Sequence, residues 1–492
     1  MFSRGLRHRF GPLMPAVLVV VAMHARFITT PISTDEGGYF AVARAWARGG
    51  VLYRDAWVDR PQGLLVLFRF FDAIGLGTPE GIRVMAILFC LLAVVACGDI
   101  AATLAGERAR WMAATATGVL LSVPQIEGFI ANGELLAGAV GAAALALMLR
   151  ATWNSPVPRL WACCAAGIVG GCALSLKQSG FDGFGAALVA IVVVMIRDKR
   201  GVSTTAKTLA AALAGFALPV AAMVVHGALT GWSRWWSAVA GYRFSQRSAD
   251  DGADWDLLRT TTKIAAPIMI PLVVVLAVVG VALLISRRLP PAELVVLATW
   301  FAAGSVGFMA GGHFHRHYWL IFMAPLGTTL AVFLARLTRE SLAVVGLGVV
   351  MVAPLAMTIS AVLGPRDTMG VDLHGDKRVD RNEAVAAWLS QRDALDETVY
   401  AMCASSGLYG LLESDPPFPY LWFDGVRHFP GARERLVNLL SGDTGPRYVV
   451  IYQSAIRCDP SGTVEAALAA NYIEVDEVAG MPVLERTIGS GP

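Results

Sequence analysis

The sequence has 492 residues, of which 56% are hydrophobic and 16% are charged, and its mean hydropathy is +0.58. In soluble domains about a quarter of all residues are charged, so this composition excludes an ordinary water-soluble fold. The formal net charge of +3 is small, and no block of Lys and Arg forms the basic stripe that a nucleic-acid backbone requires. Nucleic acid is therefore not expected as a partner.

The first apolar run covers residues 12–28 and follows three arginines, Arg4, Arg7 and Arg9. Positive charges flank membrane spans on the cytoplasmic side, so this pattern places the N-terminus in the cytoplasm. The residues after the run lack the small-residue spacing of a signal-peptidase site, which predicts a retained first span.

Ten further apolar runs follow, and most approach the roughly 20 residues that cross the hydrocarbon core of a bilayer. They lie near 82–104, 110–123, 132–150, 160–176, 181–197, 207–229, 264–286, 292–310, 317–336 and 341–363. If the chain crosses at each run, every short loop on the cytoplasmic side carries Arg or Lys, as the positive-inside rule requires. The apolar segment 63–76 is too short to cross and is expected to lie in the interface. The sequence predicts a polytopic α-helical membrane protein with about eleven spans.

The composition changes after residue 363 to a charged, proline-containing tail. Its helix and strand patterns lie at 381–391, 398–404, 448–452, 463–471, 472–478 and 482–486. They predict a small α/β domain, and an odd number of spans places this domain outside the cytoplasm. The expected organisation is a membrane domain over 1–363, with a first outer loop at 29–81, and an extracytoplasmic α/β domain over 364–492.

The tail also contains two cysteines outside the apolar runs, Cys403 and Cys458, each near one of its two main strands. An oxidising compartment permits a disulfide between them, and two unpaired buried thiols are the alternative. Four aromatic residues could stack on sugars, although core packing is the commoner role of such residues. They are Tyr409, Tyr420, Trp422 and Phe423.

The first outer loop contains a helical pattern over residues 33–50. Ser33 or Thr34 can cap its N-terminus, and Gly49 and Gly50 end it. Apolar residues line one side and arginines another, which predicts a helix that lies along the membrane surface. Asp35 and Glu36 fall in the first turn, where the helix dipole favours anions. This acidic pair is as typical of a helix cap as of a catalytic site, and the residues alone do not decide between them.

Two further polar features fall on the outer side. Lys177 ends an apolar span, where an ammonium either snorkels to the surface or meets an anion such as a lipid phosphate. Histidines alternate between His313 and His317, so they share one face of an extended segment. The pattern could hold zinc, but no Asp, Glu or Cys is adjacent, which favours interfacial anchoring over a metal site.

The segment TDEGGYFAVARAWARGGVLYRDAWVDRPQG, from residue 34 to residue 63, resembles the first extracytoplasmic loop of GT-C glycosyltransferases. This superfamily includes protein O-mannosyltransferases and lipid A aminoarabinose transferases. The motifs ANGELLAGAV, LSLKQSG and HFHRHYWLIFMAP and the α/β tail follow in the family's order, all on one side of the membrane in the predicted topology. The resemblance implies a GT-C-like fold and a location in the inner (cytoplasmic) membrane. It also implies an enzyme that transfers a sugar from a polyprenyl-phosphate donor to an extracytoplasmic acceptor.

The resemblance also implies roles for particular residues. Asp35 would be the general base of an inverting reaction, and Glu36 would be its acidic neighbour. The residues expected to contact the donor phosphate or sugar are Arg60, Glu134, Lys177, Arg316, His317 and Tyr318. Some members of the superfamily use a divalent cation such as Mg²⁺ or Mn²⁺, for which Asp35 and Glu36 are the candidate ligands.

The donor sugar could be a hexose or a pentose, and the acceptor a glycan, a lipid or a protein of the cell envelope. The alternative interpretations are a secondary transporter or flippase for lipid-linked sugars, and a non-catalytic scaffold that binds them. Transporters place charges near the membrane midplane and often contain internal repeats, whereas the polar residues here gather at the outer rim. We therefore expect an enzyme.

Overall fold

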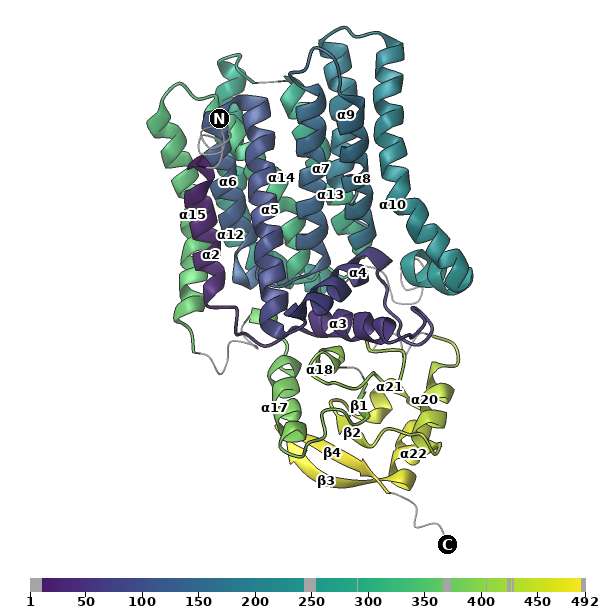
Figure 1. The fold of residues 1–492 in the computed structure, drawn as a ribbon. Coiled ribbons are helices and arrows are strands. Elements are labelled where there is room, and N and C mark those ends of the chain that lie inside the picture. Colours follow the sequence, from purple (N-terminus) through teal and green to yellow (C-terminus); the bar gives the residue numbers. More distant parts are fainter. Residues whose placement is uncertain are drawn as a thin grey trace.

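The computed structural model describes residues 11–242, 254–289, 291–365, 373–403, 405–422, 426 and 429–487. These residues form a tall helical bundle and a smaller domain with a sheet, which lies against one end of the bundle (Figure 1). We call this end of the bundle the domain end and the opposite one the far end.

Eleven helices run along the bundle (Figure 1). They are α2 (Met14–Ala25), α5 (Pro79–Ala105), α6 (Glu107–Leu121), α7 (Gly133–Thr152), α8 (Leu160–Leu176), α9 (Asp182–Arg197), α10 (Val202–Trp236), α12 (Trp255–Ile285), α13 (Pro291–Gly311), α14 (Leu320–Ala335) and α15 (Glu340–Leu363). Each overlaps one of the predicted apolar runs. Seven helices of the described chain are long and apolar enough to cross a membrane, and α2, α6, α8 and α9 are shorter. The prediction of a polytopic α-helical membrane protein is confirmed.

The position of each helix in the bundle follows from its burial. Helices α5, α7 and α14 are mostly buried, whereas α10 and α12 expose many large apolar side chains, as expected of helices that face lipid. The described chain begins at the far end, opposite the C-terminal domain (Figure 1). A charged network at the far end joins neighbouring helices, because Asp99 of α5 pairs with Arg110 of α6 and with Arg150 of α7.

Two short helices, α3 (Thr34–Ala47) and α4 (Gln62–Phe71), lie across the domain end (Figure 1). The π-helical turn η2 (Asp72–Leu76) follows α4, so this segment reaches α5 without crossing the bundle, in agreement with the expectation for 63–76. Helix α3 is covered on both sides. It is buried from Glu36 to Ala43, because α4 and the bundle cover one side and the C-terminal domain covers the other.

The C-terminal domain contains a four-stranded mixed sheet in the order β1-β2-β4-β3. The strands are β1 (Val399–Met402), β2 (Tyr448–Ile451), β3 (Tyr472–Val478) and β4 (Met481–Arg486), and the helices are α17 (Arg378–Ser390), α18 (Ser406–Tyr409), α20 (Ala432–Ser441), α21 (Ala455–Cys458) and α22 (Thr463–Asn471). Strands β1 and β2 are parallel, whereas β4 runs antiparallel to both of its neighbours. All four strands occur where the apolar runs of the tail predict them, but α18, α20 and α21 are not predicted.

The two cysteines of the tail form a disulfide that links the end of β1 to α21, Cys403 to Cys458, with 5.9 Å between their Cα atoms. Of the four aromatic residues singled out in the tail, Tyr409 is buried in the core. Tyr420 and Trp422 are partly buried and pack against the core, and Phe423 lies outside the described residues.

Candidate active site

Two cavities meet at the domain end, where α3, the loop before α4 and η5 (Arg316–Trp319) approach the C-terminal domain. The polar cavity has a volume of about 110 Å³ and is lined by Asp35, Trp57, Asp59, Arg60, Tyr242, His313, His315, His317, Tyr318 and Trp422. The apolar cavity has a volume of about 320 Å³ and is lined by Glu134, Lys177, Gln178, Ser179, Phe181, Val239, Ala240, Val306, Gly307, Phe308, Ala310, Tyr318 and Ile321. Tyr318 lines both, so the two cavities adjoin.

Asp35 lies in the first turn of α3 and lines the polar cavity. Ser33 caps the helix, because its hydroxyl accepts a hydrogen bond from the backbone N–H of Glu36 at 3.2 Å. The half-buried carboxylate of Asp35 accepts a hydrogen bond at Oδ1 from the indole Nε1–H of Trp422, at 3.1 Å. The base expected from the sequence therefore lies on a cavity wall, between the bundle and the C-terminal domain.

Glu36 is fully buried, and it is absent from the described residues that line the two cavities. Its carboxylate pairs with Arg83 of α5 and accepts hydrogen bonds from the backbone N–H groups of Ser33 at 3.1 Å and Ala131 at 2.7 Å. These contacts fasten α3 to two parts of the bundle, which differs from the expected position beside Asp35 in the pocket. Arg83 lies near the start of a long apolar run, and such a charge signals a buried partner.

The contacts of Asp35 and Glu36 also decide whether the two carboxylates could bind one metal ion together. The carboxylate of Asp35 is directed to Trp422, whereas that of Glu36 is enclosed by Arg83 and two backbone donors. The pair therefore does not fit a cation that both residues would bind. Within the described residues, no three His, Cys, Asp or Glu side chains lie close enough together to hold a metal ion.

Arg60 is buried at the end of the loop before α4 and lines the polar cavity. Its Nη1 donates to Asp59 Oδ1 at 2.5 Å, and its guanidinium lies 5.6 Å from the centre of the Tyr39 ring. Burial would lower the pKa of Arg60, but Asp59 and the neighbouring acidic groups raise it well above its ordinary value. Its buried Nε has no hydrogen-bond partner among the described residues. The guanidinium of Arg60 is thus a permanent cation whose Nε–H can donate a hydrogen bond to a ligand.

A chain of charged groups borders both cavities. Lys177, which follows α8, forms an ion pair with Glu134 in the first turn of α7, and its Nζ lies 4.4 Å from the centre of the Tyr318 ring. His317 lies between two carboxylates, with Nδ1 2.6 Å from Glu127 Oε2 and Nε2 3.8 Å from Glu134 Oε2. The contact with Glu127 is a hydrogen bond, whereas the contact with Glu134 is within ion-pair distance only.

Glu127 also approaches the start of the C-terminal domain, since its Oε1 lies 3.6 Å from His374 Nδ1. Burial alone would raise the pKa of Glu127, but the contacts with His317 and His374 hold it well below its ordinary value. Glu127 therefore remains an anion that joins η5, the loop before α7 and the segment after α15.

Arg316 does not line either cavity, which differs from its expected contact with the donor. Its Nη1 donates to the backbone oxygen of Leu373 at 2.9 Å, so it holds the start of the C-terminal domain. The alternation of the sequence explains this position. The rings of His313, His315 and His317 share one face and stack with centroid distances of 6.2 and 5.7 Å, and the intervening Arg316 points elsewhere.

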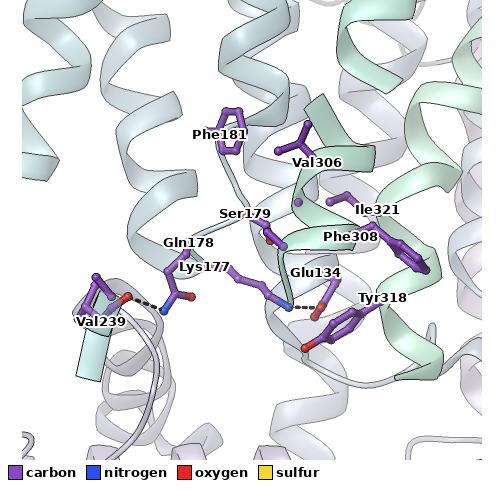
Figure 2. Close-up of a pocket in the computed structure, with 13 residues that line it drawn as sticks. Glu134, Lys177, Gln178, Ser179, Phe181, Val239, Val306, Phe308, Tyr318 and Ile321 are labelled. Atoms are coloured by element: carbon purple, nitrogen blue, oxygen red, sulfur yellow. Dashed lines mark hydrogen bonds and ion pairs between the residues drawn. The ribbon is translucent and has the colours of Figure 1, made fainter. Parts of the chain in front are cut away.

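The apolar cavity extends from this charged rim into the bundle. Figure 2 shows Lys177 directed toward Glu134 near Tyr318, whereas Phe181 and Val306 lie deeper between the helices. One wall comes from η4 (Ser237–Gly241), which follows a break in α10 at Gly231, where φ is 124°. A φ in this range favours glycine.

Gln178 holds this wall in place. Its side-chain amide donates to the backbone oxygens of Asp59 at 2.9 Å and Val239 at 3.0 Å. An apolar chamber that ends at Lys177 and adjoins a cavity with a carboxylate suits an amphiphilic substrate with an anionic head.

Several lining residues are missed by sequence reasoning. Trp57 and Tyr242 carry no charge and lie far apart in the sequence, and Asp59 is not among the residues expected to contact the donor. Their positions depend on packing between the first outer loop and the C-terminal domain, such as the bridge between Trp57 and Tyr420. A single sequence contains no signal for these pairings.

No protein-family model matches the sequence, and no curated protein matches it either. Solved structures do share its fold. ArnT from Cupriavidus metallidurans, crystallised with undecaprenyl phosphate, aligns over 98% of both chains with a TM-score of 0.63 and 16% identity. The Archaeoglobus fulgidus oligosaccharyltransferase in its apo form aligns over 99% of this chain and 75% of its own, with a TM-score of 0.57 and 11% identity. The same archaeal enzyme, AglB, in complex with an inhibitory peptide and a dolichol-phosphate, aligns over 98% and 75%, with a TM-score of 0.54 and 11% identity. The chain therefore shares the fold of these structures along nearly its whole length.

Proposed function

We propose that this protein is a glycosyltransferase that moves a sugar from a polyprenyl-phosphate donor to an acceptor on the outer side of the cytoplasmic membrane. The observation that carries the proposal is the junction of the two cavities at Tyr318, with the Asp35 carboxylate in one and Lys177 at the rim of the other. The fold supports it, because ArnT and AglB structures of this fold contain undecaprenyl phosphate and a dolichol-phosphate.

The apolar cavity accounts for the lipid part of the donor. Its walls are mostly aliphatic and aromatic, and its volume of about 320 Å³ accommodates the first isoprene units of a polyprenyl chain. The phosphate would then lie at the rim, within reach of Lys177 and of the unused donor of Arg60. A phosphate that binds here would compete with Glu134 for Lys177.

The polar cavity accounts for the transfer step. Asp35 takes the proton of the acceptor hydroxyl while its oxygen attacks the anomeric carbon, and the bond from that carbon to the phosphate oxygen breaks. The electron pair of this bond leaves with the polyprenyl phosphate, whose charge Arg60 and Lys177 stabilise. Attack from the side opposite the phosphate inverts the configuration of the sugar. Glu36 takes no part in this proposal, because Arg83 and backbone donors occupy its carboxylate.

The same proposal sets the orientation. The far end carries the arginine-rich loops and belongs in the cytoplasm, and the domain end belongs outside. The disulfide between Cys403 and Cys458 supports this orientation, because such bonds persist in oxidising compartments.

The test is transfer by the purified protein in liposomes that contain radiolabelled polyprenyl-phosphate hexoses or pentoses and a mixture of envelope acceptors. Asp35→Asn is expected to lower turnover by roughly 10²- to 10⁴-fold. Asp55→Asn is the matched control, because Asp55 belongs to the same loop region but pairs with Arg54 outside both cavities. Movement of the intact donor across the membrane without release of polyprenyl phosphate would replace this proposal with a flippase.

A further inference from the structure

Trp422 is the residue of the C-terminal domain that reaches Asp35. An indole nitrogen can only donate, so its hydrogen bond at 3.1 Å marks Asp35 Oδ1 as the acceptor. The side chain also lines the polar cavity, next to the residues that come from the bundle.

The position of the indole depends on a glycine pair in α3. A Cβ atom at Gly38 would lie 2.5 Å from Cζ2 of Trp422, so a side chain at this position would displace the ring. A Cβ atom at Gly37 would lie 2.6 Å from the backbone oxygen of Gly407 in α18. The ring of Tyr39 lies 5.9 Å from the indole and closes another side. The two glycines thus let the C-terminal domain approach α3 closely enough to place Trp422 at the carboxylate.

We propose that Trp422 is a positioning residue for Asp35, so that the C-terminal domain completes the catalytic centre. This inference rests on the proposed function, in which Asp35 is the base. With Oδ1 held by the indole, rotation of the carboxylate is restricted, and Oδ2 is the oxygen that takes the proton of the acceptor.

Trp422→Phe tests the inference because it keeps an aromatic ring in the space beside Gly38 and removes the N–H donor. We expect kcat to fall by about tenfold, the effect of one hydrogen bond to a charged group. KM for the lipid donor should remain close to that of the wild type, because Trp422 does not line the apolar cavity.

Trp388→Phe is the matched control. The indole of Trp388 donates to Asp476 Oδ2 at 2.6 Å in the same domain, and neither residue lines the two cavities. This variant loses an equivalent hydrogen bond and should retain the kcat of the wild type.

Gly38→Ala provides a second, independent variant, because the added methyl group displaces the indole without changing it. It should also lower kcat, and the double variant with Trp422→Phe should lose less than the product of the two single losses. Monodisperse elution and an unchanged melting temperature would confirm that the variants are folded.

The outcomes separate the inference from the function on which it rests. If the wild type transfers sugar and Trp422→Phe matches it in kcat, the positioning role is wrong and the glycosyltransferase stands. If Trp388→Phe loses as much as Trp422→Phe, the effect belongs to the domain as a whole and the positioning role is again wrong. If the wild type transfers no sugar, the proposed function is wrong, and the inference about Trp422 is wrong as well because it rests on that function.

Discussion

Glu134 and Lys177, which are 43 residues apart in the sequence, form a buried ion pair at the rim of the apolar cavity. Removal of one partner leaves an uncompensated charge, so Lys177→Gln should lower the free energy of unfolding by about 3–5 kcal/mol. The double variant Lys177→Gln/Glu134→Gln should recover most of this stability, because neither charge remains. It should not recover transfer, since the cation for the donor phosphate is lost. Thermal unfolding and the transfer assay on the same preparations check both statements, and full activity of the double variant would contradict the role of Lys177.

Glu36 and Asp35 are neighbours in the sequence but should respond differently to neutral substitution. Glu36→Gln leaves Arg83 without its anion, so we expect a lower melting temperature and a lower yield of folded protein. The folded fraction should turn over at nearly the rate of the wild type, whereas folded Asp35→Asn should be almost inactive. Active-site titration with a donor analogue normalises the rates to folded protein. A near-complete loss of turnover in folded Glu36→Gln would contradict this prediction and show that Glu36 takes part in the reaction.

Chelation of divalent cations should leave transfer unchanged. The Asp35 carboxylate lies against Trp422, and that of Glu36 lies against Arg83, so the two do not converge on a common ion. The cations that face the phosphate in our proposal are side chains. The measurement is the rate of transfer after dialysis against EDTA, with and without added Mg²⁺ or Mn²⁺. A loss that either ion reverses would show that a metal acts at this site.

The disulfide between Cys403 and Cys458 gives a test of orientation. It closes a loop of 55 residues within the C-terminal domain, so its reduction should destabilise that domain by about 2–4 kcal/mol. A membrane-impermeant maleimide should label these cysteines in intact spheroplasts only after reduction. The variant Cys403→Ser/Cys458→Ser is the control for the remaining cysteines of the helices. Labelling only after the membrane is opened would place the domain in the cytoplasm.

Much of the fold follows from the sequence because it depends on local patterns. Apolar runs mark each helix of the bundle, and the strands of the tail appear as short apolar segments between turns. The burial of α3 on both sides is not predicted, and the reason is physical. Its amphipathic pattern shows that one side is apolar, but the closeness of the C-terminal domain depends on Gly37 and Gly38, whose partners are Gly407 and Trp422.

The sequence predicts several residues of the candidate site, but it does not predict which of them contact each other. Six predicted residues line the two cavities: Asp35, Arg60, Glu134, Lys177, His317 and Tyr318. Their roles remain proposals. The contacts that organise them join residues 47, 190 and 387 positions apart, as in the pairs Glu36–Arg83, Glu127–His317 and Asp35–Trp422. Such contacts arise only when distant segments pack together, and neither periodicity nor composition encodes them.

Glu127 should make the stability of the protein depend on pH. Its pKa in the folded protein lies well below the ordinary value of 4.5, because His317 and His374 face its carboxylate. A carboxyl group with a depressed pKa adds stability above the unfolded value, and this stability is lost as the pH falls toward the folded value. The free energy of unfolding should therefore differ most between the wild type and Glu127→Gln near pH 6, and the difference should shrink below about pH 4.5. Unfolding of both proteins in the same detergent across this range measures the difference. If the difference stays constant down to about pH 3.5, then the charge of Glu127 is not what holds the three segments together.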